Sequence, residues 1–149
     1  MSKHVRQYIG IFAALAVYYV VHEGAHLIAA LIIGTFRELR FLGPGIQVDV
    51  NAESMTDTQL GIFCVVGALA TLIVAYALTF LREPVCRSKS RVFRASAYYV
   101  TIALLTLDPL YLSLLCGIFG GGDMNGIKLL VPEPAARITA GLIFIRLVR

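Results

Sequence analysis

The sequence predicts an all-α membrane bundle of three to four transmembrane helices, with a small membrane-associated β-hairpin after the first span. Hydrophobic residues make up 58% of the 149 residues and charged residues only 15%, whereas a soluble domain is nearer about 45–50% apolar and about 25% charged. The apolar residues gather in long runs, and the first linker between runs alternates apolar with polar residues. We therefore expect one multi-pass integral membrane unit over residues 1–149.

The first three apolar runs are each long enough for a membrane span. The first, Tyr8–Ile33, would be about 39 Å long as a helix at 1.5 Å per residue, and a bilayer core is about 30 Å thick. The second run is Leu60–Leu81, and the third is Ala95–Phe119 with Asp108 and Pro109 inside it. These three runs predict three transmembrane helices.

A fourth segment, residues 123–148, is less regular because it contains charges and two prolines. We expect a short helix, a proline break, and then a second helix over Ala135–Val148. That second helix either completes a fourth span or lies in the membrane interface. The three linkers between segments are Thr35–Gln59, Arg82–Arg94 and Gly120–Gly122.

The basic residues lie at the ends of the apolar runs. The formal net charge of +4 would be compatible with nucleic-acid binding. The cations are dispersed among the apolar runs, however, and do not form the continuous basic stripe of a nucleic-acid-binding protein. We therefore expect the lipid bilayer as a partner and no nucleic acid. Lys3 and Arg6 precede the first run, and five more cations fall in the Arg82–Arg94 linker. Two spans separate these segments, so they share one side, and the positive-inside rule assigns that side to the cytoplasm.

The Thr35–Gln59 linker has the pattern of a β-hairpin. Apolar and polar residues alternate on both sides of Gly43-Pro44-Gly45, and after this turn the apolar positions are Ile46, Val48, Val50 and Ala52. Period-two alternation around a turn predicts two paired strands. The hairpin is either a small cap outside the membrane or an edge where Ile46, Val48 and Val50 pair with an extended peptide substrate.

Residues 22–26 form an H-E-x-x-H motif inside the first apolar run. Residues four apart share a helix face, so His22 and His26 could both reach one zinc ion at about 2.0–2.1 Å. Glu23 would lie beside that ion, where it could take a proton from a water molecule. The alternative is that these side chains only hydrogen-bond neighbouring helices, which is a costly use of ionisable groups inside a span.

A catalytic zinc site needs a third protein ligand and an open position. The remaining histidine, His4, lies too far along the helix, so a carboxylate is expected. Asp123 follows three glycines that would let the backbone approach closely, although it could instead cap a helix. Asp108 precedes Pro109 within the third run, where it could support a kink or hold a ligand in place. We favour Asp123 and keep Asp108 as the alternative.

With these residues the chain resembles the site-2 protease family of intramembrane zinc metalloproteases. The resemblance lies in the motif at His22–His26 inside an apolar span, in Gly34 and the stretch RELRFLGPGIQVDV that follows, and in the Asp of GGGDMNGI. It covers nearly the whole chain, as a minimal core without an appended PDZ-like domain.

This resemblance implies one zinc ion per chain, held by His22, His26 and Asp123, with Glu23 as the catalytic base. It implies hydrolysis of peptide bonds within or near the transmembrane helices of membrane-protein substrates, and a membrane-embedded hairpin that holds the substrate as an added strand. The alternatives are a catalytically inactive metal-binding regulator and a different membrane metalloenzyme. The intact Glu23 favours the protease, since binding alone needs no base.

The chain departs from the family pattern in two respects. The family commonly has an N-x-x-P element before its Asp-Gly pair, but here Leu115 and Ile118 occupy roughly those places and Met124 follows the aspartate. We expect Asn125 and Asp108 to support the ligands instead. The family also usually places its metal near the cytosolic face, whereas the charge rule places it near the opposite face. The topology, the physiological substrate and the oligomeric state therefore stay open.

Overall fold

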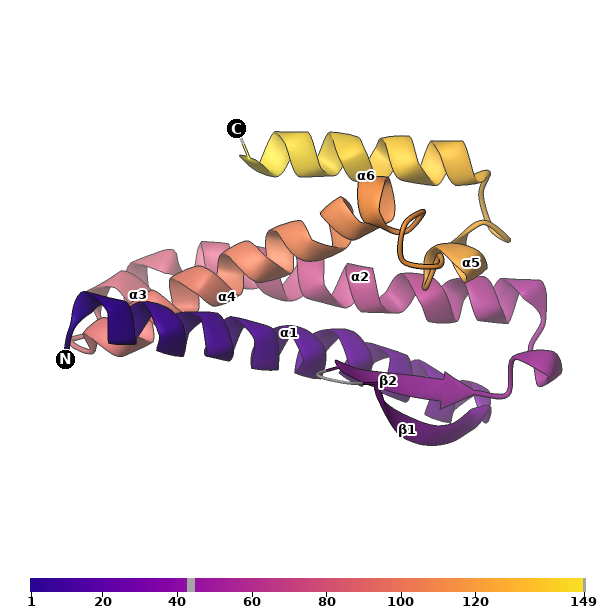
Figure 1. Ribbon diagram of the computed structural model, residues 1–149, viewed down its shortest axis with the longest axis horizontal. Coiled ribbons are helices and arrows are strands. Elements are labelled where there is room, and N and C mark those ends of the chain that lie inside the picture. The colour runs from indigo at the N-terminus through magenta and orange to yellow at the C-terminus, as the bar shows by residue number, and fades with distance from the viewer. Residues whose placement is uncertain (43–44, 149) are drawn as a thin grey trace.

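The computed structural model describes residues 1–42 and 45–148, and it is mostly helical. Within these residues, three helices are long and apolar enough to cross a membrane, by length and composition. They are α1 (Lys3–Ile33), α2 (Asp57–Phe80), and α4 (Arg91–Leu110) with its π-helical continuation η2 (Tyr111–Leu115). The three predicted long apolar helices are therefore confirmed. In Figure 1 they run beside one another along the long axis of the molecule.

Each long helix begins at a hydroxyl side chain that accepts a hydrogen bond from a free backbone N–H. Ser2 does so for α1, Thr56 for α2 and Ser90 for α4, over 3.2–3.3 Å. Thr56 and Gln59 form a reciprocal capping box. Such caps satisfy donors that a helix otherwise leaves unpaired, so the polar residues at the ends of the apolar runs define where the helices start.

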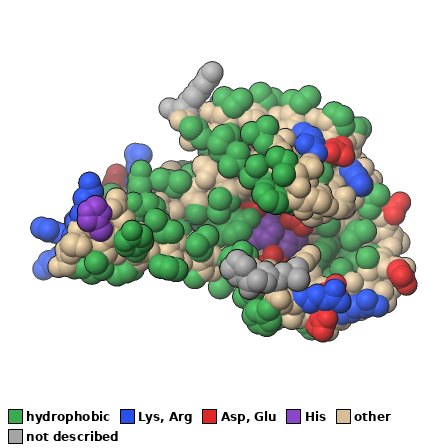
Figure 2. Space-filling view, viewed as in Figure 1, with side chains coloured by type: hydrophobic (Ala, Val, Ile, Leu, Met, Phe, Trp, Pro, Cys, Tyr) green, Lys and Arg blue, Asp and Glu red, His purple; other side chains and the backbone are tan. Residues whose placement is uncertain are grey.

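The three long helices pack through small and branched side chains. α1 contacts both α4 and α2, and α2 also contacts α4. The buried cluster between them consists of Ala14, Ala75, Val100 and Leu104. Large apolar side chains remain exposed on the outer faces, among them Phe12, Ile32 and Phe80 at 71%, 80% and 84%, and Figure 2 shows such side chains along the length of the molecule. A soluble monomer rarely exposes this much contiguous apolar surface.

The predicted hairpin is confirmed. Strands β1 (Phe36–Leu42) and β2 (Gly45–Val50) pair antiparallel, with Leu39 opposite Val48 and a register shift near the start of β1. The hairpin lies beside the C-terminal half of α1 (Figure 1). Gly43 and Pro44 of the predicted turn lie outside the described residues. The predicted alternation stops before Ala52, which begins the short 3-10 helix η1 (Ala52–Ser54).

Several boundaries differ from the predicted ones, since α1, α2 and α4 each begin three to five residues before the predicted apolar run. The linker Arg82–Arg94 contains the helix α3 (Arg82–Arg87), because Pro84 is compatible with a first helical turn. The third long helix ends at Leu115 rather than Phe119. Pro109 removes one backbone donor inside α4, and the π-helical turn follows directly after it.

The fourth segment forms two helices separated by a break at Pro132, as predicted. They are α5 (Met124–Ile127) and α6 (Glu133–Val148). The second begins two residues before the predicted Ala135, since Pro134 fits within a first helical turn. The 16 residues of α6 measure about 24 Å, less than the about 30 Å of a bilayer core. α6 packs on α4 and η2.

Candidate metal centre

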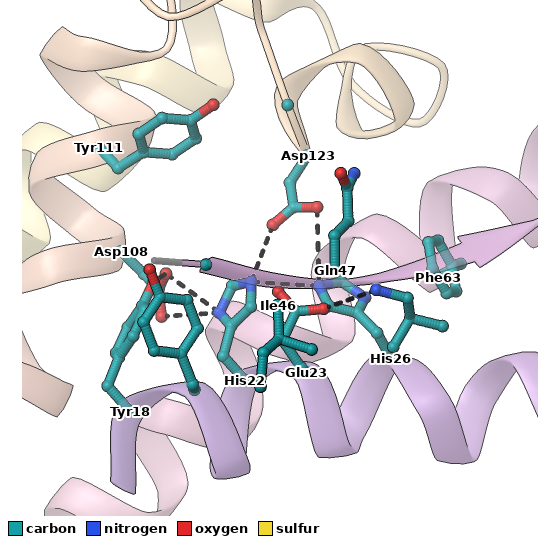
Figure 3. A pocket seen from close by; sticks show the side chains of 14 residues that line it. Tyr18, His22, Glu23, His26, Ile46, Gln47, Phe63, Asp108, Tyr111 and Asp123 are labelled. Carbon is teal, nitrogen blue, oxygen red and sulfur yellow. Dashed lines mark hydrogen bonds and ion pairs between the residues drawn. The ribbon is translucent and has the colours of Figure 1, made fainter. Parts of the chain in front are cut away.

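His22 and His26 lie one turn apart on the buried face of α1. Their side chains are 10% and 4% exposed, and their Nε2 atoms are 3.1 Å apart. Tyr18, one turn earlier on the same face, stacks on the His22 ring with 5.3 Å between ring centroids. The H-E-x-x-H spacing therefore directs two imidazole nitrogens to one point, as Figure 3 shows.

Asp123 reaches the same point from the loop after the third long helix. Gly120, Gly121 and Gly122 all have positive φ, a conformation that glycine adopts at little cost. Asp123 precedes α5 but its side chain does not cap that helix. Its carboxylate instead lies 3.2 Å from His22 Nε2 and 3.6 Å from His26 Nε2 (Figure 3). The helix-cap alternative for this residue is therefore not what the structure shows.

These three groups have the spacing of metal ligands. Two atoms bound at about 2.0–2.1 Å to a tetrahedral ion lie about 3.3–3.4 Å apart. The two Nε2 atoms are 3.1 Å apart, one Asp123 oxygen is 3.2 Å from His22 Nε2, and the other is 3.6 Å from His26 Nε2. Each residue offers one ligand atom, these atoms all lie within 4.8 Å of one another, and the three residues line the same pocket. His22, His26 and Asp123 could therefore hold a metal ion and leave a fourth position open.

Asp108 lies on the other side of the His22 ring. Its carboxylate oxygens are 3.2 and 3.4 Å from His22 Nδ1. Tyr18 Oη and Thr71 Oγ1 each donate a hydrogen bond to it over 2.5 Å. A carboxylate on Nδ1 keeps the proton there and leaves Nε2 free as a ligand. Asp108 therefore contacts the His22 nitrogen that points away from Asp123 and His26.

His26 is held differently. Its ring packs against Phe63 of α2 at 4.7 Å between centroids. Among the side-chain atoms that the structure describes, its Nδ1 is buried and has no hydrogen-bond partner. The two imidazoles are therefore unequal, since one is oriented by a carboxylate and the other by packing.

Gly67 of α2 faces both imidazoles. A Cβ atom at this position would lie 2.5 Å from His26 Nε2 and 2.8–2.9 Å from two atoms of the His22 ring. Real Cβ atoms do not approach other heavy atoms this closely. The absence of a side chain at Gly67 is therefore what makes room for the two histidines against α2.

Glu23 lines the same pocket as the two histidines and Asp123, in a cavity of about 340 Å³. One of its carboxylate oxygens accepts a hydrogen bond of 3.0 Å from the backbone N–H of Val48 in β2. That contact ties the hairpin to α1. In Figure 2 the histidines are visible at the bottom of the hollow between the hairpin and the upper part of the molecule.

The remaining predicted residues divide into two groups. Ile46 and Val48 line the pocket, whereas Val50 packs against the core next to it. Asn125 is exposed and donates to the Gly120 carbonyl, so the structure does not bring it to the ligands. Among the residues that line the pocket, Tyr111 on the π-helical turn is an addition to the sequence-based set.

Besides Tyr111, the sequence interpretation missed Tyr18, Gly67 and Thr71, which contact the site residues. Each had a signal in the sequence. Tyr18 precedes His22 by four residues, and Gly67 precedes Thr71 by four, so each pair shares a helix face. Thr71 was also one of the few polar interruptions of the second apolar run.

We expect Gly67→Ala to lower the affinity for metal, because the new methyl group must displace the imidazoles. Overpacking of this kind costs about 1–3 kcal/mol, which corresponds to about 5- to 150-fold in affinity. Metal content after equilibration against a metal buffer measures the effect. Gly24→Ala is the matched control, since a Cβ there meets nothing within 4 Å. Equal metal content in both variants would contradict the proposed role of Gly67.

Thr71→Val should weaken metal binding by about 10- to 100-fold, because Asp108 loses a donor and orients His22 less well. Thr79→Val on the same helix is the control, since among the described residues the Thr79 hydroxyl donates to the Ala75 carbonyl and not to Asp108. Titration with a competing chelator gives the affinity of each variant. If the two valine variants bind metal equally well, Asp108 does not act through this hydrogen bond.

Comparison of the chain with protein-family models, with curated proteins and with solved structures finds no match. What can be said of the site therefore comes from the contacts between its own residues. In the described residues, His22, His26 and Asp123 could hold a metal ion, the carboxylate of Asp108 lies against the other nitrogen of His22, and Glu23 lines the same open pocket.

Proposed function

We propose that this chain is an intramembrane zinc metalloprotease of the site-2 protease type, which cleaves peptide bonds within or near transmembrane helices. One observation carries the proposal. His22, His26 and Asp123 have metal-ligand spacing, and Glu23 lines the same pocket, on a helix long and apolar enough to cross a membrane. A metal-binding group and a candidate base at such a position favour hydrolysis over a purely structural role.

The donor set favours zinc. Two imidazoles and one carboxylate, with a fourth position open, form the ligand pattern of several catalytic zinc sites. A zinc ion bound there would supply an activated water and a Lewis acid for the peptide carbonyl. The residues of the chain then have separate tasks, in which His22, His26 and Asp123 hold the ion and Asp108 orients His22.

Glu23 is the proposed general base. It follows His22 directly, so it points about 100° away around the helix, beside the ligands rather than among them. Its contact with the Val48 N–H fixes the carboxylate at the wall of the pocket. From there it would take a proton from the attacking water and pass it to the leaving amine.

The free edge of β2 is the proposed docking edge for the substrate. Because the Val48 N–H points to Glu23, we infer that the Leu39–Val48 pair does not bond across the hairpin and that the backbone groups of Val48 point away from β1. Alternation along the strand puts the backbone groups of Ile46 on the same edge, and Ile46 also lines the pocket. A substrate strand would bond to Ile46, whereas at Val48 it would have to replace the contact with Glu23. Val50 would continue this edge beyond the pocket.

An extended substrate suits the physical problem of cleavage inside a bilayer. A peptide bond within a helix is shielded, and unwinding the helix in lipid exposes polar groups at a cost of several kcal/mol each. Backbone partners on β2 would offset that cost. We therefore propose single-span membrane proteins as substrates, cleaved near helix-weakening residues. In this proposal α1, α2 and α4 span the bilayer, the hairpin lies within it, and α6 completes the bundle at its edge.

Glu23→Gln should retain zinc and lose cleavage of a single-span model substrate in proteoliposomes by about 10²- to 10⁴-fold. The amide oxygen can still accept from the Val48 N–H, so the pocket keeps its shape. Glu53→Gln is the matched control, because Glu53 is exposed on η1 outside the pocket, and it should cleave at the wild-type rate.

Two results would decide against the proposal. If the Glu23→Gln variant cleaves at near the wild-type rate, Glu23 is not the base. If the wild type binds zinc yet cleaves no transmembrane substrate, the chain is a metal-binding regulator rather than a protease.

A further inference from the structure

A second cavity lies at the opposite end of the molecule from the metal centre. It has a volume of about 210 Å³ and is bounded by the C-terminal end of α2, by α3 and by the first half of α4. Figure 1 places α3 near the N-terminus, whereas the hairpin and α5 lie toward the other end. Most of the lining is apolar, with Leu78, Val85 and Ala97 among its residues. This cavity is separate from the proposed catalytic pocket.

Two arginines, Arg82 and Arg94, line this largely apolar cavity, which also contains Thr79 and Thr101. Arg94 is half-buried, and one of its terminal nitrogens donates to the Ser88 carbonyl, which fixes the guanidinium in place. Among the described side chains, neither arginine has a carboxylate within ion-pair distance, since Glu83 pairs with Arg87 instead. Both guanidinium groups therefore have donors available for a ligand.

The surroundings of the cavity are strongly basic. The segment from residue 82 to residue 94 has five cations and a single carboxylate, and Lys3 and Arg6 begin the helix at the same end. Figure 2 shows the Lys and Arg side chains gathered there. The positive-inside rule explains why cations favour one side of a membrane. It does not explain why two of them line a hydrophobic cavity without acidic partners.

We propose that this cavity binds an anionic phospholipid, with the phosphate between Arg82 and Arg94 and part of an acyl chain along α2 and α4. The charge of the arginines requires an anion, and the apolar lining requires that the anion has a hydrocarbon part. Both requirements are met at the end of two helices that are long enough to cross a membrane. Basic pockets between transmembrane helices are known to bind anionic head groups. The proposal does not depend on protease activity.

The test is lipid binding by the purified full-length chain in detergent, measured by native mass spectrometry. Phosphatidylglycerol and phosphatidylcholine of equal chain length are titrated separately, with inorganic phosphate as a competitor. The wild type should retain phosphatidylglycerol at about tenfold lower concentration than phosphatidylcholine. Inorganic phosphate should compete only weakly, because it lacks the acyl chain.

The variants separate a defined site from diffuse charge. Arg82→Gln with Arg94→Gln should remove the preference for phosphatidylglycerol. Lys89→Gln with Arg91→Gln lowers the net charge equally at residues that do not line the cavity and should keep the preference. Arg82→Gln alone, at an exposed residue without a partner in the described chain, should weaken binding without endangering the fold.

Three outcomes would overturn the proposal. Equal losses in the two double variants would mean that only the overall charge attracts lipid. Equal retention of the two lipids would remove the role of the phosphate charge. Complete competition by inorganic phosphate would make the site one for a free anion rather than for a lipid.

Discussion

The convergence of two imidazole Nε2 atoms and one carboxylate is the interaction on which the rest of the molecule depends. With Asp108 on His22 Nδ1, the His22 Nε2 lone pair points at His26 Nε2, 3.1 Å away. Two nitrogens at this distance need a proton or a cation between them, and the Asp123 carboxylate adds negative charge to that position. Each of the three long helices contributes to this arrangement. α1 supplies the pair, α2 leaves room at Gly67, and the chain after α4 brings in the carboxylate.

The end of the third long helix is irregular because it must do two things at once. Asp108 has to stay buried to hold His22, while Asp123, fifteen residues later in the sequence, must return to the other side of the same ring. Pro109, the π-helical turn after it and the three glycines with positive φ form this return. Irregular backbone of this kind is tolerated at membrane depth where it is packed against protein or faces a cavity. The departures from helical structure therefore lie where the site needs them.

Much of this could be predicted from the sequence, because the signals are local. The length of the apolar runs predicts the three long helices, period-two alternation predicts the hairpin, and the spacing of His22 and His26 predicts a shared helix face. Contacts between helices have no such local signal. The choice of Asp123 over Asp108 as a ligand, and the close approach of Gly67, depend on how α2 and α4 pack against α1. The sequence around Asp123 likewise has no feature that predicts the hydrogen bond from Asn125 to the Gly120 carbonyl.

X-ray absorption at the zinc edge of the purified chain can show whether His22, His26 and Asp123 hold a zinc ion. We expect one zinc ion per chain with only nitrogen and oxygen neighbours at about 2.0–2.1 Å, two of them imidazoles. Asp123→Asn should change this spectrum, whereas Asp108→Asn should leave the number and type of neighbours unchanged. A sulfur neighbour at about 2.3 Å, or a spectrum that responds to Asp108 and not to Asp123, would rule out this ligand set.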